Sequence, residues 1–152
     1  MNSGVELDEK RSSENCLWEE VESLTKSVAS KIRKSSGKNN HDAILAVTNG
    51  GIVPARLMAR ELDINHILLI PIRNRKLYEE EMPLLFHDKR YIIIDDIYDT
   101  GYTFSNVYRV VKGFDCDFAF LMSRYKTDNN TVEGAYVGKI LNHDKWIVFP
   151  WE

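Results

Sequence analysis

The residues with the clearest chemical potential are three carboxylates that lie close together beyond the middle of the chain. Asp95 and Asp96 directly follow the apolar run Tyr91–Ile94, and Asp99 opens an Asp-Thr-Gly-Tyr-Thr segment at residues 99–103. Carboxylates this close repel one another unless a ligand or a metal compensates their charge. Acidic groups can bind hydroxyls or a metal, and a glycine-containing turn before a helix can bind an anion. Together these residues suit a phosphorylated sugar.

The elements around the acidic residues are expected to hold them at one edge of a parallel sheet. The run Tyr91–Ile94 lacks alternation of apolar and polar residues, which is typical of a strand buried on both faces. The acidic pair would then lie at the carboxyl end of that strand, where open α/β sheets bind ligands. Apolar residues at helical spacing follow, at Phe104, Val107, Tyr108 and Val111. The turn therefore leads into a helix amino terminus, whose first N–H groups have no partner within the helix.

The rest of the chain alternates strand and helix patterns, as expected for a parallel sheet with crossover helices. From Leu17 to Ile32 apolar residues recur every three or four positions, which predicts an amphipathic helix. Further elements expected are strands at residues 43–47, 67–72, 118–122 and 136–141, a helix that begins at Pro54, and a long loop or hairpin at residues 73–90. We therefore predict one α/β domain over residues 15–152, preceded by a flexible segment at residues 1–14.

Composition and charge restrict the class of protein further. A hydrophobic content of 43% and a charged content of 28% are typical of a soluble globular domain. The net charge of −3 argues against a general nucleic-acid binder, which usually carries a basic excess. Apolar runs are too short to span a membrane, and the N-terminus lacks the apolar core of a signal peptide. Cys16 and Cys116 are isolated in the sequence, so we expect both to be reduced thiols in a cytoplasmic protein. From the charge and the short apolar runs, we expect neither a nucleic-acid nor a membrane partner.

Residues 91–103 resemble the phosphoribosyl-pyrophosphate motif of type I phosphoribosyltransferases, which consists of an apolar strand, an acidic pair and an Asp-Thr-Gly-x-Thr loop. The resemblance implies the type I fold, with a parallel sheet, flanking helices and a small C-terminal hood over the base. Two other interpretations are a capped strand followed by an ordinary turn, and an acidic pocket like that of response regulators. In response regulators, however, the acidic pair normally follows the first strand, whereas about ninety residues come first here.

The resemblance also implies a role for each residue of this motif. Asp95 and Asp96 would bind the ribose hydroxyls and a Mg²⁺ ion. Asp99 would lie near N7 of the base and act as the general acid/base that handles its proton. The 5-phosphate would be surrounded by Asp99, Thr100, Gly101, Tyr102 and Thr103.

A second segment resembles the pyrophosphate loop of the family. It follows the strand expected at residues 43–47 and consists of Thr48, Asn49, Gly50 and Gly51. Two glycines allow backbone N–H groups to approach an anion closely, although a tight strand-to-helix turn is the alternative interpretation. Many purine-specific members carry a basic residue at the position of Asn49, so one cationic contact could be missing here. Basic residues of the long loop that could replace it, unless they are simply solvated, are Arg73, Arg75 and Lys76.

The C-terminal segment at residues 144–152 resembles the tail of the short bacterial and archaeal xanthine-guanine phosphoribosyltransferases. In that tail an aromatic residue stacks on the purine, the next residue offers backbone groups, and a later acid helps to hold the metal. By position, Trp146 would stack on the base, Ile147 would supply the backbone contact and Glu152 would be the acid. Stacking on an aromatic ring contributes about 1–3 kcal/mol per base. The alternative is that Trp146 only packs within a terminal strand.

In the same subfamily a lysine donates to the 6-oxo group of the purine. Here Arg124 stands at the matching position and Lys126 lies two residues further on, and either can donate to a carbonyl. The resemblance implies a purine salvage enzyme, a pentosyltransferase that joins phosphoribosyl pyrophosphate to guanine, xanthine or hypoxanthine, with Mg²⁺, in a homodimer or homotetramer. The other interpretation is a regulator that senses phosphoribosyl pyrophosphate or nucleotides without catalysis. A regulator that binds RNA or DNA would need a basic face or an appended DNA-binding domain, and neither is evident in this acidic single domain. A third interpretation, an enzyme that uses a pyrimidine as acceptor, is disfavoured by Trp146.

Overall fold

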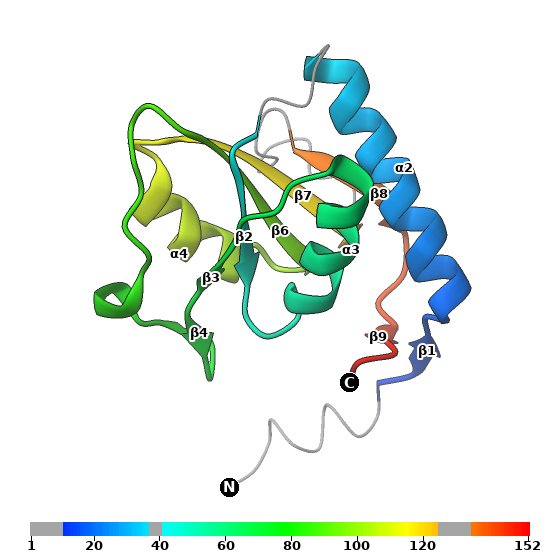
Figure 1. The fold of residues 1–152 in the computed structure, drawn as a ribbon. Coiled ribbons are helices and arrows are strands. Elements are labelled where there is room, and N and C mark those ends of the chain that lie inside the picture. The colour runs from blue at the N-terminus through cyan, green and yellow to red at the C-terminus, as the bar shows by residue number, and fades with distance from the viewer. Residues whose placement is uncertain (1–10, 37–40, 125–134) are drawn as a thin grey trace, which may run out of the picture.

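A computed structural model describes residues 11–36, 41–124 and 135–152, and this part of the chain folds around a five-stranded parallel sheet (Figure 1). The strand order is β3-β2-β6-β7-β8. In chain order the elements are β1 Ser13–Asn15, α2 Trp18–Ser36, β2 Ala43–Val47, α3 Ile52–Leu62, β3 Ile67–Ile70, β4 Ile72–Arg73, β5 Lys76–Leu77, the 3₁₀ turn η1 Glu79–Glu81, β6 Arg90–Tyr98, α4 Tyr102–Val111, β7 Asp115–Arg124, β8 Tyr136–Leu141 and β9 Trp146–Val148.

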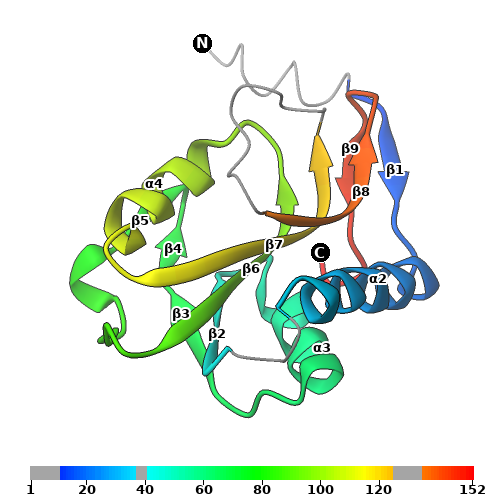
Figure 2. The same cartoon turned by 90° about the horizontal axis from the view of Figure 1, so that it is seen from above.

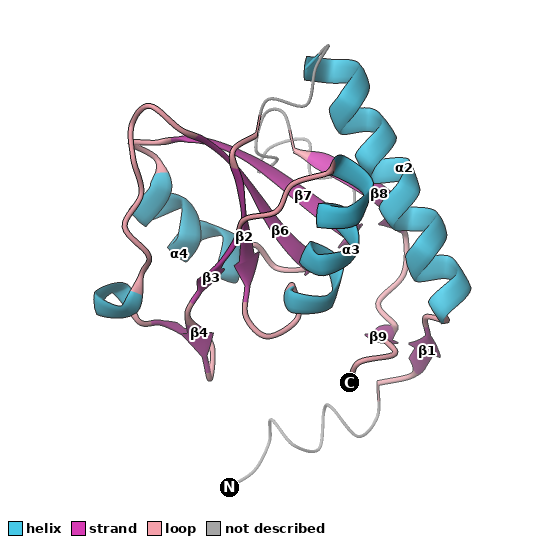
Figure 3. Ribbon diagram, viewed as in Figure 1, coloured by secondary structure: helices cyan, strands magenta, loops and turns pink. Residues whose placement is uncertain are grey.

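The sheet lies between two helical layers, with α2 and α3 on one face and α4 on the other (Figures 2 and 3). The central strand β6 packs against both layers. Its residues Ile92 and Ile94 belong to the apolar cluster with α2 and α3, whereas Tyr91 and Ile93 belong to the cluster with α4. Burial on both faces is the reason why this run shows no alternation, and it confirms the predicted parallel α/β architecture.

The connections diverge between β2 and β6, which are neighbours in the sheet. From β2 the chain passes through α3 to β3 on one side, and from β6 it passes through α4 to β7 on the other side. Where neighbouring strands send their crossovers in opposite directions, a crevice opens outside their carboxyl ends, and open α/β sheets bind their ligands there. The loop after β2 and the acidic residues of β6 therefore both lie at this crevice.

The strand that carries the acidic pair is longer than its sequence predicts. It was expected to end at Ile94, but β6 runs to Tyr98 because its second half stays paired with β7, with Asp95 opposite Phe120 and Tyr98 opposite Ser123. Pairing of β6 with β2, in contrast, ends at Ile94. Asp95 and Asp96 therefore lie within a strand, but beyond the last residue that pairs with β2.

Other boundaries have local reasons. The strand pattern at residues 67–72 was expected to break at Pro71, and it does: β3 ends at Ile70 and β4 begins at Ile72, because Pro71 offers no N–H to the ladder. The polar stretch at residues 73–90 contains part of a short antiparallel hairpin, β4–β5, followed by η1. Leu17 was expected on the buried face of the first helix, but α2 begins only at Trp18 and Leu17 is 64% exposed.

The first and the last strand of the described residues pair beside the main sheet (Figures 1 and 2). Strand β1 pairs in parallel with β9, with Ser13 opposite Trp146, and the N–H of Trp146 donates to the carbonyl of Ser12 at 2.9 Å. The segment expected to be flexible, residues 1–14, thus overlaps a paired strand. Among the helices of the described residues, none combines the length and the apolar character that a membrane crossing requires.

Candidate active site

Two glycines after β2 lie directly against the acidic strand. A Cβ atom on Gly50 would come within 2.4 Å of the Asp96 carboxylate, and a Cβ on Gly51 would come within 2.4 Å of the Ile94 carbonyl oxygen. Either contact is far too short for a side chain, so the backbone can approach β6 this closely only without one. The structure therefore brings the Gly50-Gly51 loop and the acidic pair into one site, as the sequence predicted, and the same glycines also form the tight turn into α3.

The first two residues of this loop have different surroundings. The Thr48 hydroxyl lies 3.0 Å from the carbonyl oxygens of both Ile70 and Ile72 and accepts a hydrogen bond from the Ile72 N–H at 2.9 Å. Its side chain therefore ties the loop to the neighbouring strands across Pro71. Asn49 is exposed, and the Thr48–Asn49 peptide bond is cis.

The acidic pair has little compensation within the protein. The N–H of the following residue donates to each carboxylate, at 2.8 Å for Asp95 and 2.7 Å for Asp96, and the Trp151 side chain lies close enough to Asp96 to offset part of the rise that burial causes in its pKa. No ion pair in the described part of the chain involves either carboxylate. Burial, together with the charge of Asp96, raises the pKa of Asp95 well above its ordinary value, and burial also raises the pKa of Asp96. A ligand that donates hydrogen bonds or carries positive charge would therefore stabilise the ionised form of the pair.

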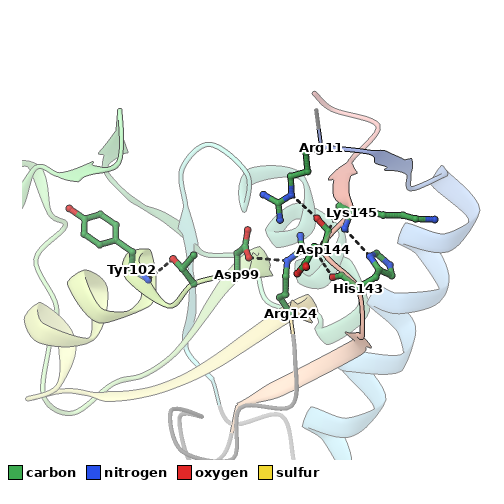
Figure 4. Close-up of polar contacts among 8 residues, drawn as sticks. Arg11, Asp99, Tyr102, Arg124, His143, Asp144 and Lys145 are labelled. Carbon is green, nitrogen blue, oxygen red and sulfur yellow. Dashed lines mark hydrogen bonds and ion pairs between the residues drawn. The ribbon is translucent and has the colours of Figure 1, made fainter. Parts of the chain in front are cut away.

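The loop from Asp99 to Thr103 ends at a helix amino terminus, as predicted. Gly101 immediately precedes α4 and has a φ of 87°, and a Cβ at this position would lie 2.6 Å from the Tyr98 hydroxyl. Both the left-handed backbone and the contact require glycine. The Tyr102 N–H donates to the Thr100 hydroxyl at 3.3 Å (Figure 4). The first turn of α4 has no acidic side chain, so its N–H groups and the helix dipole favour a bound anion.

Asp99 is held by an arginine from the neighbouring strand (Figure 4). Arg124, the last residue of β7, donates from Nε to the Asp99 carboxylate at 2.9 Å and from Nη1 to the carbonyls of His143 and Lys145. The Arg124 side chain is 3% exposed and that of Asp99 is 33% exposed. Sequence reasoning assigned Arg124 to the base and did not foresee this ion pair. Lys126, the other candidate donor, lies outside the described residues.

The C-terminal tail reaches the same crevice. The side chain of Trp146 is 46% exposed, whereas Ile147 is buried. Glu152 lines the same cavity as the acidic pair, and burial together with the charge of Asp96 raises its pKa. Trp151 stacks on Phe149 with ring centroids 4.9 Å apart and packs against the buried cluster beneath the tail.

Two cavities meet at the acidic residues. The first, of about 210 Å³, extends towards the loop before α4 and is also lined by Arg75. The second, of about 270 Å³, extends towards the tail and is lined by Gly50, Arg124, Ile147 and Glu152. Both cavities are lined by Asp95, Asp96, Ile97, Asp99 and Trp146. The acidic residues and Trp146 therefore border both cavities, and the first cavity also borders the amino terminus of α4.

The basic residues proposed to replace a contact at Asn49 are not equivalent. Arg73 forms an ion pair with Glu81 at 2.5 Å and stacks over Tyr78, and the ammonium group of Lys76 lies 5.1 Å from the same ring. Arg75 alone of the three lines the first cavity. Of the three candidates, Arg75 is therefore the one placed to contact an anion there.

Arg11 lies outside the two cavities but supports the tail that borders them, a contact that the sequence did not predict. Its guanidinium lies 5.6 Å from the ring centroid of Trp146, and its Nε donates to the Asp144 carbonyl at 2.6 Å. The polar N-terminal sequence gave no signal of this contact, because the pairing of β1 with β9 joins segments more than a hundred residues apart.

Comparison with known proteins agrees with this geometry. A family model described as the phosphoribosyl transferase domain matches residues 17–152. A xanthine-guanine phosphoribosyltransferase of Desulfotalea psychrophila is 30% identical over 141 residues, which cover 89% of this chain and 83% of the relative. A purine phosphoribosyltransferase from Pyrococcus horikoshii has a similar structure, with a TM-score of 0.70, 30% identity and coverage of 92% of this chain and 94% of that one. The xanthine-guanine-hypoxanthine phosphoribosyltransferase of Helicobacter pylori shares the fold, with a TM-score of 0.75 and 19% identity over 92% of this chain and 93% of that one.

A parallel sheet whose switch point carries an acidic pair, a glycine loop and a helix amino terminus has the features of an α/β protein with an anion site at the carboxyl ends of its strands. With the family model matching most of its length, the chain belongs to the phosphoribosyltransferase family.

Proposed function

We propose that the chain is a purine salvage phosphoribosyltransferase. It transfers phosphoribosyl from phosphoribosyl pyrophosphate to guanine, xanthine or hypoxanthine and releases the nucleoside 5′-monophosphate and pyrophosphate. The observation that carries the proposal is the pair of cavities that share Asp95, Asp96 and Asp99, because these carboxylates lie in one crevice with the amino terminus of α4 and with Trp146. The similarity to a xanthine-guanine phosphoribosyltransferase and to a purine phosphoribosyltransferase supports the choice of acceptor.

The phosphorylated sugar fits the first cavity and its borders. Thr100, Gly101, Tyr102 and Thr103 would bind the 5-phosphate at the amino terminus of α4. The ribose hydroxyls would donate to Asp95 and Asp96, whose carboxylate oxygens lack cationic partners in the described part of the chain. The backbone of the loop from Thr48 to Gly51 would bind pyrophosphate, since its glycines leave the main chain uncovered.

A magnesium ion fits the carboxylates at the shared border of the cavities. The described residues contain no cluster of three or more side chains that could hold a metal on their own. Magnesium usually takes one or two carboxylates and completes its shell with water and substrate phosphates. Asp95, Asp96 and Glu152 are therefore proposed as candidate ligands, of which one or two would share the ion with the substrate, and when bound the ion would neutralise the departing pyrophosphate.

The transfer itself requires a placed acid/base and a fixed sugar. The bond from C1 of the ribose to the pyrophosphate oxygen breaks, and pyrophosphate leaves with the electron pair. A ring nitrogen of the purine forms the new bond to C1, and Asp99 accepts the proton that the base must lose. Asp99 borders both cavities, so its carboxylate can reach a base held in the second one.

The base would lie in the second cavity. Trp146 would stack on the purine ring, the backbone of Ile147 would contact its edge, and Arg124 or Lys126 would face its 6-oxo group. The guanidinium of Arg124 lines this cavity, so a carbonyl oxygen is favoured there over an amino group.

We further propose that the protein is a homo-oligomer of the cytoplasm. Large apolar side chains that are half or more exposed, such as Leu84 and Phe86, support a homodimer or homotetramer. Both cysteines are free thiols, and burial raises the pKa of each to about 12, which suits a reducing cytoplasm.

The test is an acceptor screen with labelled phosphoribosyl pyrophosphate and Mg²⁺, using guanine, xanthine, hypoxanthine, adenine and uracil at equal concentration. Initial rates with the oxopurines are expected to exceed the rate with adenine at least about tenfold, because an amino donor would face the Arg124 cation. Adenine used as well as guanine, or uracil as the sole acceptor, would overturn the assignment of the base. A protein that binds phosphoribosyl pyrophosphate but transfers to none of the five bases would be a regulator instead.

A further inference from the structure

Arg124 connects Asp99, the proposed general acid/base, to the turn at residues 143–145, which directly precedes the proposed stacking residue Trp146 (Figure 4). From one guanidinium, Nε donates to Asp99 at 2.9 Å, and Nη1 donates to the carbonyls of His143 at 2.8 Å and Lys145 at 3.0 Å. The side chain is 3% exposed, so these hydrogen bonds face little competition from water. Two of the three guanidinium nitrogens are thus engaged by the protein itself.

A second arginine holds the same turn from the N-terminal segment. Arg11 donates from Nε to the carbonyl of Asp144 at 2.6 Å, so the carbonyls of residues 143, 144 and 145 all accept from arginines. The next residue, Trp146, has the Arg11 guanidinium over its ring. Both arginines contact the turn, but Arg124 also contacts Asp99, whereas Arg11 contacts Trp146 instead.

We propose that Arg124 is a positioning residue, which fixes the Asp99 carboxylate relative to the turn at residues 143–145 and therefore relative to Trp146. This inference rests on the proposed function, because it assigns Arg124 a role in the same transfer. The forked guanidinium can bond the carboxylate and two carbonyls at once, whereas the single ammonium of a lysine cannot reproduce that geometry. Arg124 then acts on turnover through Asp99, even if the cation also faces the base.

A double-mutant cycle on turnover tests this role, with Arg124→Lys, Asp99→Asn and the double variant. Arg124→Lys keeps a cation that could still donate to a 6-oxo group, but it loses the fork. We expect its kcat to fall by about 10–100-fold, the scale of a misplaced catalytic group, with little change in KM for phosphoribosyl pyrophosphate. In the Asp99→Asn background, the same change is expected to cost less than about threefold.

Arg11→Met is the matched comparison, because it removes an arginine from the same turn and leaves Asp99 untouched. It is expected to raise KM for the base while kcat stays within about threefold. The proposal is overturned if Arg124→Lys costs as much in the Asp99→Asn background as it does in the wild type. It is also overturned if the loss appears only in KM for the base and in the preference for oxopurines over adenine.

A second measurement does not depend on activity or on folding of an Arg124 variant. In Asp99→Ala, hydrogen exchange of the Arg124 Nε–H and of the Trp146 N–H is expected to accelerate, because the coupling between the two ends is reciprocal. Unchanged exchange at both groups would overturn the link. If the wild-type protein is inactive with every base, both the proposed function and the role of Arg124 in turnover are rejected. The exchange experiment then tests only whether Arg124 links Asp99 to the turn at residues 143–145.

Discussion

The two ends of the β6–β7 strand pair both carry carboxylates, but basic side chains compensate their charge at only one of the two ends. At the amino end, Asp117 lies 2.6 Å from Nε2 of His41 and 3.0 Å from Nη2 of Arg90, and Arg90 also pairs with Asp115. The hydrogen bond from His41, reinforced by the charges of His41 and Arg90, lowers the pKa of Asp117. At the carboxyl end, burial raises the pKa of Asp95 and of Asp96, and no ion pair of the described residues relieves them.

This difference separates a structural cluster from the cluster for which we propose a function. Carboxylates whose charge is matched within the protein contribute to stability at neutral pH. Carboxylates that are buried without a partner cost stability and gain only when something else supplies positive charge or hydrogen-bond donors. Asp99 stands between the two cases, because Arg124 compensates its charge while one third of its side chain stays exposed to the crevice. The three predictions below probe this contrast, from the largest expected effect to the smallest.

Removal of divalent metal should have the largest effect, and only on the carboxyl end. Transfer is expected to be lost in excess chelator and restored by Mg²⁺ or Mn²⁺, because hard oxygen ligands and pyrophosphate need that charge. The melting temperature of the substrate-free protein should change little, since the amino-end cluster is complete without metal. Rates and melting curves with and without chelator check both expectations, and full activity in excess chelator would contradict the first.

Substitution of Asp99 should have the next largest effect. Asp99→Asn keeps an oxygen that can accept from Arg124 but removes the base, so turnover is expected to fall by about 10²–10⁴-fold. Binding of phosphoribosyl pyrophosphate and folding should remain close to those of the wild type. Asp115→Asn is the matched control at the amino end, where the side chain is 56% exposed, and it should leave turnover within about threefold. Near-normal turnover of Asp99→Asn would remove Asp99 from the mechanism.

The sequence predicted the parts of the site that depend on neighbouring residues. The buried run Tyr91–Ile94, the helix after Gly101 and the glycine loop after β2 are local patterns of burial and backbone freedom. Each pattern restricts its own segment strongly, and the connections of a parallel sheet then bring the segments to one crevice.

The sequence could not predict the contacts that depend on distant pairing. The extension of β6 through Asp95 and Asp96 arises because β7 lies alongside, which overrides the low strand preference of aspartate. The pairing of β1 with β9, and with it the contact of Arg11 with Trp146, joins segments more than a hundred residues apart without any motif. The Arg124–Asp99 ion pair likewise follows from strand register, which single residues do not reveal.

The smallest effect, and the most direct test of the contrast, is on stability as a function of pH. Burial and the charge of Asp96 raise the pKa of Asp95, so the folded state binds this proton more tightly than the unfolded chain does. The folded protein therefore loses stability as pH rises from about 4, the ordinary pKa of aspartate, through the raised value. Asp95→Asn cannot ionise and its side-chain oxygen can still accept from the Asp96 N–H. It should melt at a higher temperature than the wild type at pH 8.

Asp117 should show the opposite sign, because its pKa is lowered and its stabilisation is present above about pH 4 and lost below. At pH 8 Asp117→Asn is therefore expected to melt below the wild type, whereas Asp95→Asn melts above it, each by at least about 2–4 °C, the change that 1 kcal/mol produces in a domain of this size. The advantage of Asp95→Asn should shrink as the pH falls towards 4. Melting curves of the three proteins across this range decide the matter. If Asp95→Asn were the less stable protein throughout, the acidic pair would be a structural cluster like the one at the amino end.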